Sequence, residues 1–348
     1  MVTDDPATGQ GVTILASRRR TKPRVRGALG LCSWAYLVGS VGLWVLLQWA
    51  DDWWVATLSM FLPRWLFAIP LVILVPAAFW VRSRTLVAQL LFTGVVVGNA
   101  TGFNVPWQKF AVDLSQHVPF RVMTCNLHGN WRDPPEFEAL IEDTQVDVVA
   151  VQEWPGAQWS ALQTVKGWHV YNSPRLFLAS RYPIRAAINL GDNPMDEFAS
   201  ATRYDLETPI GVVHLFNLHL ATNRYGLNDV VHDNRKGARE ISANSTRRTE
   251  QSERLAAKAA EVRERVLVVG DFNTPPESRI FPQAWSDYED AFGAAGWGWG
   301  YTFLEMRTMV RIDHVLTGTG WTCNRCWVGP DVGSPHRPVI AELYWTGR

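Results

Sequence analysis

The sequence predicts an α/β domain that follows an apolar helical segment. Three apolar runs crowd into residues 28–102, and few charges interrupt them. From Pro119 onward the pattern changes to short apolar runs of strand length, which alternate with polar stretches or with stretches of helical periodicity. Several of these strand-like runs end in a carboxylate or an amide. Together these observations predict a membrane segment followed by a globular domain with a polar site at its strand ends.

Length and composition limit the number of domains and the class of protein. The 348 residues are enough for one or two domains. With 47% hydrophobic and 19% charged residues, the chain is not of the disordered class. Its formal net charge of zero argues against a dedicated duplex-DNA binder, because such proteins carry a basic face. An average over the chain conceals local patches, so nucleic acid stays among the candidate ligands.

Residues 1–26 are polar and end in a basic stretch that runs from Arg18 to Arg26. Such a run is often only solvated charge. Here it directly precedes an apolar segment, which favours a role in membrane orientation. We therefore expect a disordered basic cytoplasmic tail.

Residues 27–102 are expected to form a membrane segment with about three transmembrane helices. Ala28–Ala50 has no charged residue, and a spanning helix needs about 20 apolar residues. Leu62–Val81 and Thr85–Gly102 are the second and third candidates. A cleaved signal peptide would have a shorter apolar core and a small-residue cleavage site. A buried helical hairpin of a soluble protein is the other alternative.

The loops predict the orientation. The basic tail and Arg82–Arg84 should share the cytoplasmic side, whereas Asp51–Asp52 lies on the opposite side. Three spans then place the C-terminal domain outside the cytoplasm. Arg64, near a span end, is expected to snorkel toward the head groups, although a channel or partner surface is the alternative. Four residues suit an interfacial aromatic belt on the outer face: Trp49, Trp53, Trp54 and Trp65.

Residues 103–118 are interpreted as a linker and residues 119–348 as the strand-rich domain. Helical periodicity appears over Pro135–Thr144 and Thr246–Arg263, whereas Ala221–Ser245, with His232, has little apolar pattern and is expected to be a long functional or disordered loop. The expected strands, with more toward the end, are Arg121–Asn126, Val146–Gln152, Leu176–Ser180, Gly211–Leu218 and Val266–Gly270.

Polar residues at these strand ends point to metal chemistry. An unpaired buried carboxylate is costly, so a buried strand that ends in Asp or Glu needs a partner. One such residue is commonly a cap or a turn, but this chain has several in order. Asp271 and Asn273 are two apart, and they face the same side if the strand continues. Oxygen ligands with few cysteines suit Mg²⁺ or Mn²⁺.

A longer set of motifs carries a family resemblance. In order along the chain they are Asn126, Gln152-Glu153, Ser180–Ile184, Asn217-Leu218-His219, Gly270–Asn273, Ile312–His314 and Ser334–Pro338. This set resembles the endonuclease/exonuclease/phosphatase superfamily, with the deoxyribonuclease-I-like fold, over about residues 119–346. The resemblance implies a four-layered sandwich of two packed mixed β-sheets flanked by helices. It also implies in-line hydrolysis of a phosphate ester.

The resemblance assigns roles residue by residue. Glu153 matches the family's metal-binding glutamate, with Asn126 beside it for metal and phosphate and Asp313 as an acidic residue near the site. Asp271 and Asn273 match the pair that orients the attacking water and the phosphate. His219 and His336 match histidines that contact the phosphate. The implied catalytic set is thus His219, Asp271, Asn273 and His336; the substrate-binding set Asn126, Asn273 and His128; and the metal set Asn126, Glu153 and Asp313.

Two positions depart from the family pattern. Pro335 stands where the family has Asp before the final histidine, so we expect His336 to be less basic and less well oriented, with Asp331 as a candidate substitute. His128 stands where some nuclease members carry Asp, and it has three possible roles: metal ligand, phosphate donor or strand-end hydrogen bond.

The predicted function is a membrane-anchored, divalent-metal-dependent phosphoesterase. The phosphate-ester substrate is a nucleic acid, a lipid head group or a small molecule, and anchoring at a bilayer favours lipid. The alternative is a catalytically weakened or inactive module that binds a phosphorylated ligand on the same fold. Trp297–Phe303 is either a lipid- or base-contacting loop or core packing. Arg247, Arg248, Arg254 and Lys258 form either a basic groove or a solvated helix face. Cys323 and Cys326 form a disulfide or are two thiols.

Overall fold

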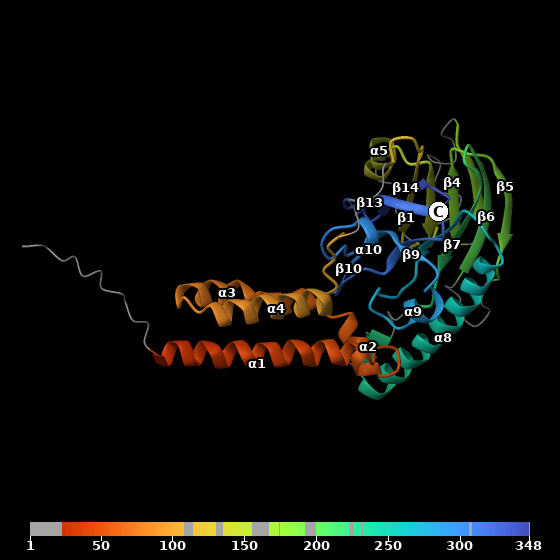
Figure 1. Ribbon diagram of the computed structural model, residues 1–348. Helices are drawn as coiled ribbons and strands as arrows, with labels where there is room; N and C mark the ends of the chain where they lie inside the picture. Colours follow the sequence, from red (N-terminus) through yellow and green to blue (C-terminus); the bar gives the residue numbers. More distant parts are fainter. Residues whose placement is uncertain are drawn as a thin grey trace, which may run out of the picture.

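The computed structural model describes residues 23–107, 114–129, 135–154, 167–173, 175–191, 200–222, 226–227, 229–230, 233–305 and 308–347. Most of the predicted cytoplasmic tail, the middle of the predicted linker and His232 lie outside these ranges. The N-terminal helical segment projects from one side of the strand domain (Figure 1). Its helices are α1 (Pro23–Leu47), α2 (Trp54–Met60), the 3-10 helix η1 (Arg64–Ala68), α3 (Ile69–Trp80) and α4 (Arg84–Thr101).

The three predicted apolar runs are helical. Ser83 caps α4 by accepting a hydrogen bond from the Leu86 amide, and Gly102 ends it in the left-handed region with φ 74°. Within the described ranges, α1 is the one helix long and apolar enough to cross a membrane. The pair Trp54–Met60 and Arg64–Trp80, bent by 79°, would be a second span if counted as one. A signal sequence near the N-terminus would meet the same criterion as α1, and α4 does not meet it.

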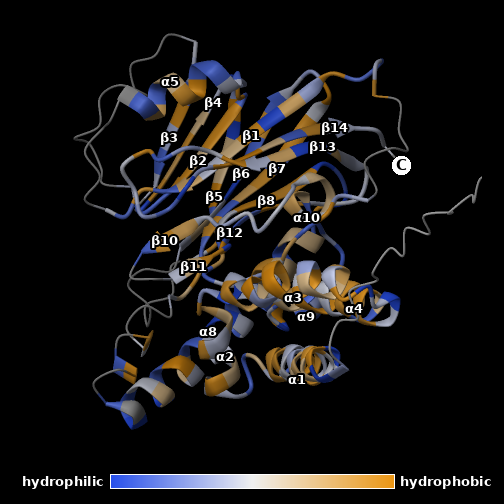
Figure 2. Cartoon of the chain, turned by 90° about the vertical axis from the view of Figure 1, so that its left-hand side faces the viewer, coloured by the Kyte–Doolittle hydropathy of each residue, from blue (hydrophilic) through white to orange (hydrophobic). Residues whose placement is uncertain are grey.

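Apolar side chains cover the outside of this helical segment. Figure 2 shows many orange, apolar positions along α1, α3 and α4. In α1, Leu31 and Val38 are 73% and 67% exposed, and in α3 Val72 is 74% exposed. Other exposed apolar residues are Trp34, Trp44, Ile73, Phe79, Trp80, Leu91, Phe92 and Val95. The segment therefore presents to its surroundings the kind of surface that a soluble domain buries.

The strand domain consists of two six-stranded mixed sheets and a hairpin. The first sheet, in spatial order, contains β13 (Trp321–Val328), β14 (Val339–Trp345), β1 (Pro119–Asn126), β2 (Val148–Gln152), β4 (Leu176–Ser180) and β3 (His169–Ser173). The second contains β5 (Ile184–Asn189), β6 (Ser200–Thr208), β7 (Gly211–His219), β8 (Val266–Asp271), β12 (Asp313–Thr317) and β9 (Glu289–Asp290). The hairpin is β10 (Phe303–Glu305) with β11 (Thr308–Val310).

The two sheets pack face to face through one apolar core and are flanked by helices (Figure 1). This is the two-sheet architecture that the family resemblance implies. The helices are α5 (Pro135–Thr144), α8 (Asn234–Ala260), α9 (Ile280–Ala284) and α10 (Ala291–Ala295). The central strands β1, β2, β7 and β8 are buried along most of their length, which explains their continuous apolar runs.

Strand register brings the polar strand ends together. β1 and β2 are parallel, with Asn126 opposite Gln152, and β7 and β8 are parallel, with His219 opposite Asp271. β12 runs antiparallel to β8, with Asp313 opposite Asp271. Because carboxyl ends of neighbouring parallel strands meet at one edge, residues far apart in sequence arrive at one place.

Most predicted elements are confirmed, two expectations change, and the alternative left open for Cys323 and Cys326 is resolved. The five predicted strands and the helix Pro135–Thr144 are present. The predicted loop Ala221–Ser245 is wrong in its second half, because α8 begins at Asn234 with Asp233 as its cap. This part of α8 is too polar to show apolar periodicity. No disulfide joins Cys323 and Cys326, both of which are on β13. Arg64 does not snorkel, because its side chain is buried against the strand domain.

Asp290 supports a prediction about stability. Its carboxylate accepts a hydrogen bond at 2.6 Å from Arg311, whose side chain is 7% exposed, and it also caps α10. Replacing Asp290 by alanine leaves a buried guanidinium without its partner, which should cost about 3–5 kcal/mol in unfolding free energy. Guanidinium unfolding followed by Trp fluorescence measures this cost. The control is Glu264, which is 65% exposed and pairs with Arg265, and Glu264→Ala should cost at most about 1 kcal/mol.

The same pair predicts a pH dependence. Burial by itself raises the pKa of the Asp290 carboxyl, but Arg311 and His314 outweigh it and hold that pKa well below its usual range. Since the unfolded pKa is about 3.9, the pair stabilises the fold above about pH 4, and this contribution is lost as pH falls through the folded-state pKa. The free energy of unfolding of Asp290→Ala should therefore fall less steeply toward low pH than that of the native chain. An equally steep fall would contradict the assignment.

Candidate active site

The carboxyl ends of β1, β2, β7 and β8 meet at a buried polar cluster. Asn126 lies at its centre, and its side-chain amide donates hydrogen bonds to Glu153 Oε1 at 3.1 Å and to Asp271 Oδ2 at 2.9 Å. His219 Nε2 lies 3.6 Å from both of these carboxylate oxygens. One amide and one imidazole thus bring together two carboxylates from different sheets.

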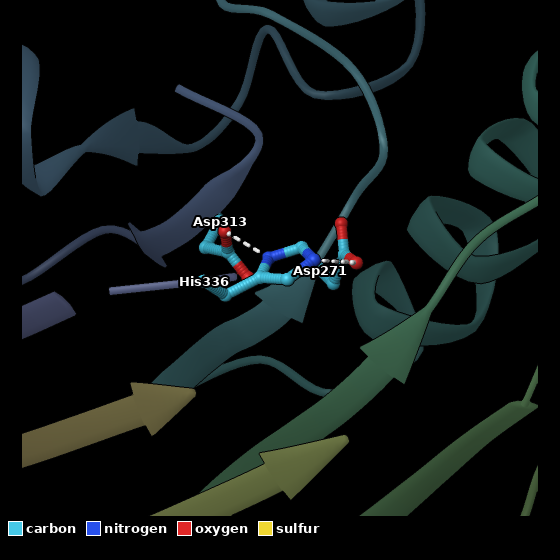
Figure 3. A group of neighbouring side chains, drawn as sticks. All are labelled: Asp271, Asp313 and His336. Atoms are coloured by element: carbon cyan, nitrogen blue, oxygen red, sulfur yellow. Dashed lines mark hydrogen bonds and ion pairs between the residues drawn. The ribbon is translucent and has the colours of Figure 1, made fainter. Parts of the chain in front are cut away.

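A histidine–aspartate pair completes the cluster. His336 Nδ1 lies 2.9 Å from Asp313 Oδ2, and His336 Nε2 lies 3.9 Å from Asp271 Oδ2 (Figure 3). Ser334 holds the loop that carries His336, because its hydroxyl donates to the Asn126 carbonyl and accepts from the His336 amide. Burial lowers the pKa of His336, but Asp313 and Asp271 outweigh this and raise it to about 9. The site therefore holds this imidazole as a cation at neutral pH.

The two carboxylates have different electrostatic environments. Burial, and then Asp313, raise the pKa of Asp271, which is 1% exposed. Burial also acts to raise the pKa of Glu153, but His219 and Asn126 outweigh it and lower that pKa. Glu153 thus stays ionised, whereas Asp271 is poised to accept a proton.

The backbone is strained at three positions of the site. His128, Glu153 and Asn273 have φ angles of 56°, 48° and 48°, in the left-handed region that non-glycine residues rarely adopt. Each follows the end of a strand: β1, β2 and β8. Such conformations cost about 1–3 kcal/mol each and cluster at functional sites, where they aim a side chain.

Only the rim of the cluster is open to solvent. The side chains of Glu153 and His128 are 21% and 30% exposed, and His128 Nδ1 lies 3.7 Å from Glu153 Oε2. The remaining members are all buried: Asn126, His219, Asp271, Asn273, Asp313 and His336. A ligand therefore reaches the cluster past Glu153 and His128.

Comparison with known proteins agrees with this geometry. The sequence profile of the Endonuclease/Exonuclease/phosphatase family matches residues 123–336. The chain belongs to this family. No curated protein sequence matches the chain.

Solved structures are similar to this chain at low identity. An endonuclease/exonuclease/phosphatase family protein from Bacteroides thetaiotaomicron is 15% identical, with a TM-score of 0.51 over 66% of this chain and 96% of that one. An endonuclease/exonuclease/phosphatase from Beutenbergia cavernae is 20% identical, with a TM-score of 0.47 over 65% and 72% of the two chains. Humanized D. rerio TDP2 is 13% identical, with a TM-score of 0.49 over 65% and 98%.

All eight residues that the family resemblance assigned lie in this cluster or on its rim. Asn273 is fixed from two sides: its backbone amide donates to Asp271 Oδ1 at 2.8 Å, and its side-chain amide donates to the Leu220 carbonyl at 2.9 Å. The backbone amide of His128 donates to Asn126 Oδ1 at 2.8 Å. Their assignment to catalysis, substrate or metal stays a prediction.

The expectation drawn from Pro335 is wrong. His336 is neither poorly oriented nor weakly basic, because Asp313 from β12 occupies its Nδ1 side. Asp331 does not substitute for the missing aspartate. Its side chain is 66% exposed and forms an ion pair with Arg337 at 3.0 Å. The orienting carboxylate comes from a strand 22 residues upstream of Pro335, which sequence adjacency does not reveal.

A prediction for Pro335→Asp follows. Because Asp313 already holds His336 Nδ1, the added carboxylate has no orienting role, and we expect kcat to change by at most about threefold. Steady-state kinetics on a chromogenic phosphodiester measures this. A tenfold or larger gain would mean that Asp313 does not orient the imidazole. Gly333→Ala, in the same loop, is no suitable control because its φ is 79°, so Asp331→Asn serves instead.

A second layer supports the cluster and was not assigned a role from sequence. The Gln152 side-chain amide donates to Thr124 Oγ1 at 2.9 Å and to Asn217 Oδ1 at 2.7 Å. The Asn217 side-chain amide in turn donates to the Val151 carbonyl at 3.1 Å. These fully buried bonds join β2 of one sheet to β7 of the other directly beneath the site. Gln152 directly precedes Glu153, and Asn217 is two residues before His219. This proximity in sequence is the signal that points to a supporting role.

The donor set fits a divalent cation. Family members typically use divalent metals, and carboxylate oxygens of Asp271 and Asp313 lie within 4.8 Å of each other beside His336. Asp313 Oδ1 is buried without a hydrogen-bond partner among the described residues. Such an oxygen is suited to bind a cation. Glu153 adds an ionised carboxylate at the rim. Carboxylate and amide oxygens favour Mg²⁺ or Mn²⁺ over softer metals.

Proposed function

We propose that this protein is a membrane-anchored, divalent-metal-dependent phosphodiesterase. Its family comprises hydrolases that act on phosphoester bonds. The observation that carries the proposal is the cluster of two carboxylates, one amide and two imidazoles around Asn126. A phosphate ester bound there would meet acceptors, donors and cation ligands at once.

Asn126, Glu153 and Asp313 would hold the cation, which we take to be Mg²⁺ or Mn²⁺. When bound, such an ion neutralises charge on a phosphoryl oxygen as the transition state forms. Glu153 is suited to this role because it stays ionised and stands at the open rim.

The chain's own groups would move the protons and orient the substrate. Asp271, with its raised pKa, is suited to accept a proton from the attacking water, and its two oxygens are fixed by the Asn273 and Asn126 amides. His219 and His336 can donate to phosphoryl oxygens from two sides. His128 adds a donor at the rim.

A non-catalytic module that binds a phosphorylated ligand is the second candidate. Its main support was Pro335, which was expected to disable His336. The hydrogen bond between Asp313 and His336 removes that support. We therefore favour the hydrolase.

Membrane anchoring is supported by the ends of the helical segment. The Arg26 guanidinium donates to Ser83 Oγ at 3.3 Å, so the α3–α4 turn lies beside the start of α1. The basic residues at that end are Arg24, Arg26, Arg82 and Arg84. Basic residues prefer the cytoplasmic side, so the strand domain at the other end would lie outside the cytoplasm. A 25-residue helix such as α1 is about 37 Å long, enough to span a bilayer of about 30 Å hydrocarbon thickness.

The charges on α8 favour a small or lipid phosphoester over a nucleic acid. Arg248 is fully buried, and Lys258 forms an ion pair with Glu261 at 2.7 Å. Arg247 donates to Asn244 and lies 3.8 Å from Glu240. Arg248 is therefore not available for phosphate contacts, and carboxylates beside the exposed Arg247 and Lys258 offset their charges, which disfavours a nucleic-acid groove along this part of α8.

The direct test is an assay of the full chain in detergent micelles with bis-p-nitrophenyl phosphate and Mg²⁺ or Mn²⁺. We expect turnover with either ion and none with excess chelator. A panel of sphingomyelin, phosphoinositides, single- and double-stranded nucleic acid and soluble phosphoesters then ranks the substrates. Ligand binding without turnover in any metal would favour the binding module. Protease accessibility in intact cells tests the proposed topology.

A further inference from the structure

The turn between α1 and α2 contacts the loop that follows β8. The Asp51 carboxylate accepts hydrogen bonds from Ser278 at 2.5 Å, Ser245 at 3.2 Å and Arg248 at 3.4 Å. Its side chain is 7% exposed and that of Arg248 is 0% exposed. Arg248 Nε and Nη1 have no hydrogen-bond partner among the described residues, so Asp51 is its main support. A residue of the helical segment thus balances a charge inside the strand domain.

A second buried contact joins the same two parts of the chain. Arg64, at the start of η1, donates to Glu277 Oε2 at 2.9 Å and to the Ala100 carbonyl at 3.0 Å. The side chains of Arg64 and Glu277 are 5% and 19% exposed. Gly102 makes the approach possible, because a side chain there would collide with the Glu277 carboxylate. Glu277 is four residues after Asn273, so this pair fixes the 273–279 loop at its far end.

An apolar cluster also joins the helical segment to the strand domain, on the side of the site where Asp313 lies. Ile312, directly before Asp313, packs in one cluster with Leu47, Ala50, Met60 and Ala100 of the helical segment. Phe303 packs against this cluster, and its ring centroid lies 4.9 Å from that of His336. The end of the helical segment therefore supports the neighbours of Asn273, Asp313 and His336 together.

We propose that Arg64 and Asp51 are positioning residues of the active site, which hold the 273–279 loop and thereby the Asn273 side chain in place. A membrane anchor needs only a covalent linker to tether a soluble domain. Here the Arg64–Glu277 ion pair, 213 positions apart, and the Ser278–Asp51 hydrogen bond, 227 positions apart, join the anchor to the active-site loop, while Asp51 also pairs with Arg248 of α8. The helical segment is thus part of the catalytic apparatus. This inference rests on the proposed phosphodiesterase function.

A double-mutant cycle on Arg64 and Glu277 tests it in the full chain. Arg64→Ala and Glu277→Ala should each lower kcat on bis-p-nitrophenyl phosphate by roughly tenfold, because a misplaced group of this kind has large kinetic effects. KM and Mn²⁺ affinity should stay within about twofold, and the double variant should be no slower than either single variant. The swapped pair Arg64→Glu with Glu277→Arg should regain part of the rate.

Arg279 provides a matched control. It belongs to the same loop and pairs with Asp52 of the same turn, but the two side chains are 44% and 55% exposed. Arg279→Ala should therefore change kcat by less than about twofold. Unchanged kcat in both Arg64→Ala and Glu277→Ala, or effects that multiply in the double variant, would overturn the proposal.

A readout without catalysis separates this inference from the proposed function. Hydrogen exchange of the peptide that spans residues 271–281 should be faster in Arg64→Lys and Glu277→Gln than in the native chain, and unchanged in Arg279→Ala. If the native chain hydrolyses no phosphoester, the proposed function fails, while faster exchange still supports the positioning contact. Equal exchange in all variants refutes the contact itself.

Discussion

Replacing Glu153 by glutamine is expected to abolish metal-dependent hydrolysis. The change keeps the side-chain shape and the Asn126 contact but removes an ionised carboxylate at the rim of the site. Cation-assisted stabilisation of a phosphoryl oxygen is worth several kcal/mol, so kcat/KM should fall by about 10³–10⁴. Mn²⁺ affinity, measured by titration calorimetry, should fall in parallel.

Glu264→Gln is the control for this experiment, since Glu264 is 65% exposed and pairs with its neighbour Arg265. It should leave both kcat/KM and Mn²⁺ affinity unchanged. Unfolding of Glu153→Gln should stay close to that of the native chain, because glutamine has nearly the same size and keeps an oxygen that can accept from the Asn126 amide. Native activity in this variant would remove Glu153 from the metal site.

The second large effect is expected at His336. Replacing it by alanine removes a buried cationic donor that lies next to Asp271. Loss of one preorganised donor in a buried site commonly costs about 10²–10³ in kcat. Mn²⁺ affinity should change by at most about threefold, because Glu153 and Asn126 remain. His336→Asn, which leaves a smaller cavity beside Phe303, should be equally slow if the charge matters.

Asp313→Asn tests whether the two residues act as one unit. In the native chain the Asp313 carboxylate holds His336 Nδ1 and raises the pKa of the imidazole. The substitution removes that charge. If Asp313 acts chiefly through His336, the double variant should be no slower than His336→Ala alone. Fully multiplicative losses would show that Asp313 acts chiefly as a ligand of the cation, independently of His336.

Much of the strand domain follows from sequence because its central strands are buried on both faces. Continuous apolar runs such as Val148–Gln152 and Val266–Asp271 predict strands from a single sequence, and the polar residues that end them indicate the site. The amphipathic helix Pro135–Thr144 was equally legible. In contrast, the sequence does not predict the first half of α8, because its residues are mostly polar and show no helical repeat of apolar positions.

What sequence adjacency cannot convey is which distant residues share a contact. The sequence by itself determined the residue types of the site, its strand-end positions and the apolar character of α1, since these are local properties. Only the tertiary structure decided that Asp313, and not a neighbour of His336, orients that histidine, because this depends on β12 lying beside β8. It also decided that Arg64 and Asp51 face a protein interior. Long-range pairing is set by how whole elements pack, and no short window of sequence contains that information.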